Sequence, residues 1–309
     1  MSLGGGRLAA LQAAVSVAAL AGVIWWFSNQ DMPSLPSFGA AAGPLAASLA
    51  LYVVATLLRG ERWHRLLGAG RRSDAYALTT VGYMGNNALP ARAGDVMKAI
   101  LGAREADIAR SDAFGALVAE RLLDAVALAS IFVVLVLAGG LPLGLGTGTL
   151  ALIGVGLALV AVVVLVVTHR LRGILAALLV PSRRLLSRRG ALLLATSVAL
   201  WMVEGSIYAE VGRIASLHLS LSDGLYVMAI ANLAAMVPAA PGYVGTFDAA
   251  VVLAVRLAGA GSAKAALPYV VLLRFVLFIP ITLVGLAFLL LRYGGIATAR
   301  AAMRRTPAA

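Results

Sequence analysis

The sequence contains no cysteine and only three histidines among its 309 residues. The lack of cysteine excludes disulfides, thiolate metal ligands and cysteine nucleophiles. The histidines, His64, His169 and His218, lie far apart in the sequence, and the HExxH pattern of zinc enzymes is missing. We therefore expect neither a metal ion nor another cofactor.

Charged residues are also scarce. They make up 12% of the chain, whereas hydrophobic residues make up 61%. A soluble domain is roughly 25% charged and roughly 45–50% apolar, so this chain lacks the polar surface that a water-soluble body needs. The composition predicts a single integral membrane domain over residues 1–309. It excludes a sizeable soluble catalytic domain, and we do not expect an enzyme.

Acidic residues are outnumbered by basic ones, with 13 Asp and Glu against 25 Lys and Arg and a formal net charge of +12. In a soluble protein this excess would suggest nucleic-acid binding. In a membrane protein it is explained by cytoplasmic loops, which collect Lys and Arg. We therefore expect no nucleic acid as partner, and anionic lipid headgroups are the natural partners of such loops.

The long apolar runs predict an all-α polytopic membrane protein with about six spanning helices, since each crossing needs about 20 mostly apolar residues. The predicted spans cover residues 8–27, 39–58, 113–138, 151–167, 191–214 and 267–291. The strongly basic segments at 59–72, 169–189 and 292–305 then share one side. The positive-inside rule makes that side the cytoplasm, together with both termini, and we expect the inner (plasma) membrane.

Two further apolar segments, 74–101 and 224–258, are broken near the middle. Each half is too short for a full crossing, so we predict two re-entrant helical hairpins. Non-helical backbone at membrane depth survives only where protein or a water-filled cavity surrounds it. Both predicted tips should therefore lie against protein or a cavity.

The two breaks share a Pro-Ala-x-x-Gly pattern, at 90–94 and at 238–242, which are 148 residues apart. Asparagine precedes each break, an aspartate follows it, and an arginine lies in a later span. These residues are Asn86, Asn87, Asp95 and Arg121 in one half, and Asn232, Asp248 and Arg274 in the other. We predict an inverted repeat, with halves at about 39–138 and 190–292, whose tips meet near the midplane. Interrupted segments at corresponding places of two halves indicate a transporter binding site.

The predicted tips have the chemistry of an anion site. A short helix starts after Gly94 and another after Gly242 or Gly245, so unpaired N–H groups should face the middle of the bilayer. Two helix N-termini aimed at one cavity suit a phosphate group, to which Arg92 could add a two-pronged contact. Alternatively, proline and glycine only end helices here and Asp95 caps one of them.

Ionisable side chains within the predicted spans are costly and usually face a cavity or a partner. They indicate a polar intramembrane cavity, although Arg121 or Arg274 could also simply neutralise Asp124, Asp248 or Glu204 to brace the bundle. The candidate substrate-binding residues are Asn86, Asn87, Arg92, Asp95, Glu120, Arg121, Asp124, Asn232, Asp248 and Arg274.

Three motifs carry a resemblance: NNALPARAGD at residues 86–95, ERLLD at 120–124 and PAAPGYVGTFD at 238–248. In this order they resemble the lysylphosphatidylglycerol synthase transmembrane-region family, also called flippase-like. The resemblance covers about residues 10–295 and implies a multi-span domain with re-entrant hairpins. In larger members this region moves aminoacylated phosphatidylglycerol between leaflets, and a separate soluble domain performs the aminoacylation. We do not expect that synthase activity here, because the 309 residues contain no such domain.

We therefore expect a transporter that moves a phosphate-bearing lipid between leaflets through a central polar cavity. One alternative is a membrane-embedded lipid-modifying transferase, for which Asp95 and Glu120 are the only plausible catalytic carboxylates. Another is a non-transporting membrane subunit of a lipid-modifying complex. The sequence is also compatible with a homo-oligomer.

Overall fold

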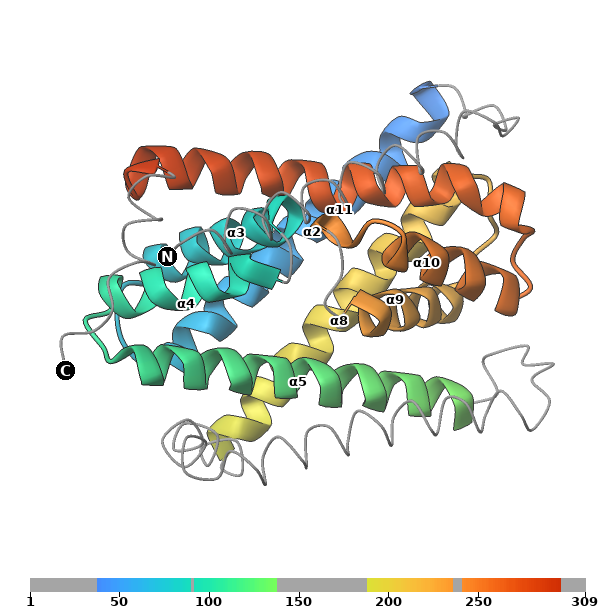
Figure 1. The fold of residues 1–309 in the computed structure, drawn as a ribbon. Coiled ribbons are helices and arrows are strands. Elements are labelled where there is room, and N and C mark those ends of the chain that lie inside the picture. The colour runs from blue at the N-terminus through green and yellow to red at the C-terminus, as the bar shows by residue number, and fades with distance from the viewer. Residues whose placement is uncertain (1–37, 90–91, 138–187, 236–240, 296–309) are drawn as a thin grey trace, which may run out of the picture.

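The computed structural model describes residues 38–89, 92–137, 188–235 and 241–295. Every element in these ranges is a helix, and the ranges contain no strand (Figure 1). The all-α prediction is therefore confirmed for the described part of the chain. The predicted spans at 8–27 and 151–167 lie outside the described residues.

Within the described ranges, three helices are long and apolar enough to cross a membrane. They are α2 (Phe38–Leu67), α8 (Arg188–Ile214) and α11 (Ala263–Arg292), and they match the spans predicted at 39–58, 191–214 and 267–291. The fourth long helix, α5 (Arg110–Leu137), matches the span predicted at 113–138 in length. Every 18-residue stretch of α5 includes Glu120, Arg121 and Asp124, so its composition alone does not make it a candidate span.

Helix α2 continues well beyond the end expected from its apolar run. The predicted span stops at Leu58, but the helix reaches Leu67 and carries Arg59 and Arg62 into the packed interior. The assignment of residues 59–72 to a basic cytoplasmic loop is therefore wrong for its first half. Carboxylates on other helices neutralise these two arginines, which makes their burial tolerable.

Both broken apolar segments form pairs of short helices. The first pair is α3 (Arg72–Ala88) with α4 (Ala93–Glu105). The second is α9 (Leu221–Ala235) with α10 (Thr246–Leu257), which the short 3₁₀ helix η3 (Pro241–Tyr243) precedes. None of the four α-helices exceeds 17 residues, fewer than the roughly 20 of a full crossing.

Each pair turns back to the end of the molecule from which it starts (Figure 1). The loop before α3 touches the loop after α4, since a Cβ on Gly70 would lie 2.9 Å from the Ala106 Cβ. The loop before α9 likewise touches the loop after α10, where a Cβ on Gly261 would lie 3.1 Å from Leu217 Cδ2. The end of α3 with the start of α4 forms the first tip, and the end of α9 with the start of α10 forms the second. The two tips therefore point toward each other from opposite ends.

The packing of α2–α5 is mirrored by the packing of α8–α11. Helices α2 and α8 pack against each other, and each also packs against its following helix, α3 or α9. Helix α3 packs against α11, as α9 packs against α5. The pairs α4–α5 and α10–α11 complete the correspondence. Exchanging α2–α5 with α8–α11 therefore leaves the main pattern of helix contacts unchanged.

The apolar core lies between α8, α9, α10 and α11 and extends to one face of α5. Large apolar side chains also remain exposed on the outer faces of the long helices, including Val53, Val134, Leu283 and Leu291. Large exposed apolar side chains of this kind typically mark a surface that contacts other proteins or a membrane. The outer surface therefore suits a lipid environment, with the polar groups gathered inside.

Candidate functional site

A network of buried charges lies where α2, α5 and α8 meet. Arg62 on α2 donates to Asp124 Oδ1 on α5 over 2.7 Å and to Ser197 Oγ on α8 over 2.8 Å. Its Nη2 also donates to Glu120 Oε1 over 3.3 Å. Arg62 and Glu120 are completely buried. One arginine thus binds side chains from two other helices.

Helix α4 joins this network through Lys98. Its Nζ donates to Glu120 Oε2 over 2.5 Å and lies 4.0 Å from the centre of the Trp63 ring. Lys98 is 1% exposed, so its charge depends on these two neighbours. Glu120 is therefore held by a cation on each side, and it is not one of the residues that line the central cavity.

The first tip is attached to α5 through Asp95. This aspartate is the third residue of α4, and its Oδ1 accepts from Arg121 Nη2 over 3.1 Å. Asn86 on α3 donates to the same oxygen over 3.0 Å and accepts from the Asp95 backbone N–H over 3.1 Å. Arg121 also donates to Asp124 Oδ2 over 3.1 Å. The tip, α3 and α5 are thereby fixed to one another.

The second tip has the same pairing of an aspartate near the start of a short helix with an arginine on a long helix. Asp248 is the third residue of α10, and Arg274 on α11 binds both of its carboxylate oxygens, over 2.6 and 2.8 Å. Arg274 also donates to the Gly242 carbonyl over 3.1 Å, while the Gly245 N–H donates to Asp248 over 2.9 Å. Aspartate and arginine are 26 residues apart in both halves.

Arg59 and Glu204 form a buried ion pair between α2 and α8. Asn232 on α9 donates to Glu204 Oε1 over 3.3 Å. Aromatic rings also contact the Arg59 guanidinium, whose Cζ lies 5.1 Å from the Tyr83 ring centre and 5.7 Å from that of Trp201. The guanidinium is thus held in one orientation by charge and by stacking.

The two tips meet directly through Arg92 and Tyr243. Arg92 Nε donates to the Tyr243 hydroxyl over 3.2 Å, and its Cζ lies 5.5 Å from the ring centre. Both residues have positive φ, 57° and 55°, a strained conformation for residues other than glycine. Such strain persists only where the surrounding structure imposes it, often at functional sites.

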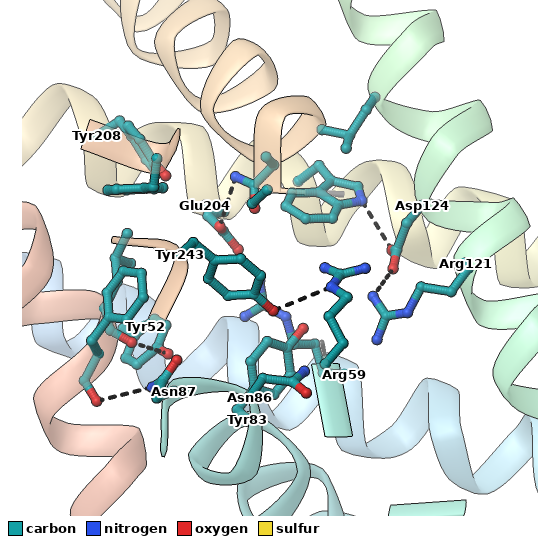
Figure 2. A pocket seen from close by; sticks show the side chains of 18 residues that line it. Tyr52, Arg59, Tyr83, Asn86, Asn87, Arg121, Asp124, Glu204, Tyr208 and Tyr243 are labelled. Atoms are coloured by element: carbon teal, nitrogen blue, oxygen red, sulfur yellow. Dashed lines mark hydrogen bonds and ion pairs between the residues drawn. The ribbon is translucent and has the colours of Figure 1, made fainter. Parts of the chain in front are cut away.

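A cavity of about 80 Å³ lies between the tips and the central helices (Figure 2). Its polar lining includes the charged residues Arg59, Arg92, Arg121, Asp124 and Glu204. The amides of Asn86, Asn87 and Asn232 and several tyrosines line it too. Behind the second tip, an adjoining groove of about 420 Å³ shares Asn87 and Phe278 with the cavity and includes Arg274.

The charges around the cavity nearly cancel. Four cations, Arg59, Arg62, Lys98 and Arg121, form ion pairs with four carboxylates, Asp95, Glu120, Asp124 and Glu204. Arg92 lines the same cavity, and within the described ranges it forms no ion pair with a carboxylate. The cluster therefore carries one surplus positive charge, located at the junction of the tips.

The structure places the ten sequence-predicted residues in two groups. Seven of them lie in or directly beside the cavity: Asn86, Asn87, Arg92, Asp95, Arg121, Asp124 and Asn232. Glu120 lies behind the cavity lining, and Asp248 and Arg274 pair beside the adjoining groove. Asn87 donates to Thr282 Oγ1 on α11 over 2.9 Å.

The predicted neutralising pairs Arg121–Asp124 and Arg274–Asp248 are present. Glu204 instead pairs with Arg59, which the sequence had placed in a loop. Sequence reasoning therefore missed Arg59, Arg62 and Lys98 as members of the network. In the described part of the chain, no group of three or more acidic or histidine side chains is arranged to hold a metal ion.

The family model described as the lysylphosphatidylglycerol synthase TM region matches residues 11–285 of the sequence. The chain belongs to this family. No curated protein and no solved structure matches the chain. Family membership, the apolar helices and the lipid-suited outer surface together make this a membrane protein with a lipid-related role.

Proposed function

We propose that the protein moves a phosphate-bearing membrane lipid between the two leaflets. The headgroup passes through the cavity between the tips while the hydrocarbon tails stay in the bilayer. The observation that carries this proposal is Arg92, a cation without a carboxylate partner in the described ranges, placed where the two tips meet above a polar cavity. A phosphate group is the natural counter-charge for such an arginine.

The helix pairs α3–α4 and α9–α10 are, on this proposal, re-entrant hairpins that enter the membrane from opposite faces. Two observations support it: each pair returns to its own end, and the helix contacts are exchanged between halves. An inverted repeat gives one binding site two related routes of access, one from each leaflet.

The orientation follows from the basic residues at the two ends. Arginines gather where α2, α4 and α11 end and where α3, α5 and α8 begin, at Arg71, Arg72, Arg104, Arg110, Arg188, Arg189 and Arg292. The opposite end has Arg213, Arg256 and Lys264. The arginine-rich end is therefore cytoplasmic, in the inner (plasma) membrane.

The cavity in this structure is small. Its volume of about 80 Å³ lies well below the roughly 300–1,000 Å³ of a small-molecule site. A cavity of this volume has room for several water molecules but not for a whole phospholipid headgroup. Transport therefore requires the tips to separate, and the Arg92–Tyr243 contact must open.

The test is leaflet exchange of fluorescent phospholipids in proteoliposomes, followed by dithionite quenching. We expect quenching beyond about half of the label with the unaltered protein, because inner-leaflet probe reaches the outside. Arg92→Ala should return quenching to about half. This substitution removes the surplus cation without leaving a buried carboxylate unpaired, so the fold should be retained.

Arg65→Ala is the matched control, since Arg65 forms an exposed ion pair with Glu61 away from the cavity. It should exchange lipid at the unaltered rate. Quenching that stays at half for the unaltered, folded protein with phospholipid, prenyl-phosphate and glycolipid probes would contradict transport. The transferase and subunit alternatives would then take its place.

A further inference from the structure

We propose that Arg59, together with Arg121, forms a phosphate-binding site inside the cavity and that this site selects lipids with an anionic phosphate headgroup. The inference rests on the proposed function for the cavity's role in transport. Arg59 lies on α2, in the segment that the sequence assigns to a loop, and it belongs to none of the three family motifs. Arg59 is one of the residues that line the cavity.

The first observation is a set of unused donors. Arg59 is 3% exposed, yet its Nε and Nη1 have no hydrogen-bond partner, and neither has Arg121 Nε. Both arginines line the cavity (Figure 2). Buried donors of charged groups are rarely left unpaired because their desolvation is costly. A group with several acceptor oxygens, bound once the tips separate, would satisfy them.

The second observation is that the Arg59 guanidinium is fixed before any ligand arrives. Its Nη2 is bound to Glu204, and the rings of Tyr83 and Trp201 lie on it. Asn232 holds Glu204 in turn. A guanidinium that is already oriented loses little conformational entropy on binding, which favours tight binding of phosphate oxygens.

The charge around the cavity defines the ligand. Four ion pairs cancel, and Arg92 leaves one positive charge. A phosphodiester carries one negative charge and would neutralise the cavity. An aminoacylated headgroup with a net positive charge would add to the surplus. The cavity therefore favours an anionic phospholipid over a lysylated one.

The test is calorimetric titration of the full chain in detergent micelles. The probes are dihexanoylphosphatidylglycerol, dihexanoylglycerol, which has no phosphate, and inorganic phosphate. We expect the phosphate lipid to bind at least about tenfold more tightly than dihexanoylglycerol. Arg59→Lys keeps a positive charge beside Glu204 but removes the two spare guanidinium donors. It should weaken binding of the phosphate lipid by about tenfold to a hundredfold, the range expected when at least one of the two hydrogen bonds to a charged group is lost.

Arg65→Lys is the matched control, because it makes the same change on the same helix at an exposed pair outside the cavity. It should bind like the unaltered protein. If Arg59→Lys lowers the unfolding midpoint, the double variant Arg59→Met with Glu204→Gln decides instead. That variant removes both charges together and leaves neither buried charge unpaired, and it should also lose phosphate-dependent affinity.

Unchanged affinity in either folded variant would overturn the inference, and would mean that water satisfies the free donors. Equal affinity for inorganic phosphate and for the phosphate lipid would replace the lipid site by a small-anion site. Binding that depends on Arg59 in a protein without leaflet exchange would keep the site and remove the transport proposal. Leaflet exchange that is unaffected by Arg59→Lys would keep the transport proposal and remove the Arg59 site.

Discussion

Arg62 is the residue on which the central packing depends most. It is completely buried and donates to Asp124, Ser197 and Glu120, which come from α5 and α8. A buried ion pair adds little net stability compared with apolar side chains of the same shape. Removing Arg62 is different, because the three buried carboxylates Asp95, Glu120 and Asp124 would then share only two cations, Lys98 and Arg121.

We therefore expect Arg62→Ala to lower the free energy of unfolding by roughly 3–5 kcal/mol. Denaturant unfolding in detergent micelles measures this change. Arg65→Ala on the same helix disrupts only the exposed pair with Glu61 and should cost at most about 1 kcal/mol. Similar small effects for both variants would show that Arg62 does not neutralise the buried carboxylates.

The acidic members of the network and Arg121 could be found from the sequence, and the other basic members, Arg59, Arg62 and Lys98, could not. Glu120, Asp124 and Asp95 stand out because acidic residues are rare within apolar segments. Arg59 and Arg62 occur in a run of basic residues after an apolar stretch, which is the pattern of a cytoplasmic loop. Only the long-range contacts, such as Arg62 with Asp124, show that they are buried.

At the scale of elements, the close pairing of α3 with α4 depends on glycine. Gly94 lies directly against the backbone of α3, and an added Cβ would overlap the Gly82 carbonyl oxygen and the Asn86 amide nitrogen. Small residues of this kind let helix backbones approach closely within a membrane. The contact also brings Asn86 and Asp95 into hydrogen-bonding distance.

Gly94→Ala should therefore push α4 away from α3 and lower the unfolding midpoint. The overlap is with backbone, which has no flexible end to move aside. The midpoint can be followed by circular dichroism on heating. Gly39→Ala is the comparison, because no atom lies within 4 Å of a Cβ there and alanine favours the helix. Equal midpoints for the two variants would refute the tight packing of this pair.

The positions of both helix pairs were predictable from the breaks in their apolar pattern, but their alignment was not. Only residues 89–92 separate α3 from α4, whereas residues 236–245 separate α9 from α10. The Pro-Ala-x-x-Gly match at an offset of 148 therefore aligns Gly94 on α4 with Gly242 on η3. The structural equivalence is Asp95 with Asp248 and Arg121 with Arg274, 153 residues apart.

At the scale of the whole molecule, the lack of native cysteine makes the proposed topology directly measurable. Single cysteines at Arg71→Cys and Ala109→Cys should react with a membrane-impermeant maleimide from the cytoplasmic side only. His218→Cys and Ser262→Cys should react from the other side. Ala88→Cys, near the first tip, should resist labelling from the His218 side if α3 ends within the membrane.

If Ala88→Cys is labelled from the non-cytoplasmic side as completely as His218→Cys, then α3 crosses the whole membrane. The repeat would then not be inverted. The sequence predicts this topology from loop charge alone, because loops rich in Lys and Arg stay on the cytoplasmic side. The contact of α2 with α8 and the small volume of the cavity depend on packing between distant segments, for which the sequence has no local signal.

The central claim is that lipid headgroups pass between the two tips, and joining the tips reversibly tests it most directly. Ala88 and Val244 line the same groove at opposite tips and are not among the candidate binding residues. The measurement is leaflet exchange in proteoliposomes with Ala88→Cys and Val244→Cys joined by a reducible crosslinker. We predict that exchange stops on crosslinking, returns on reduction, and is unaffected by the reagent in either single-cysteine variant. Exchange that continues at the same rate with the tips joined would contradict the account.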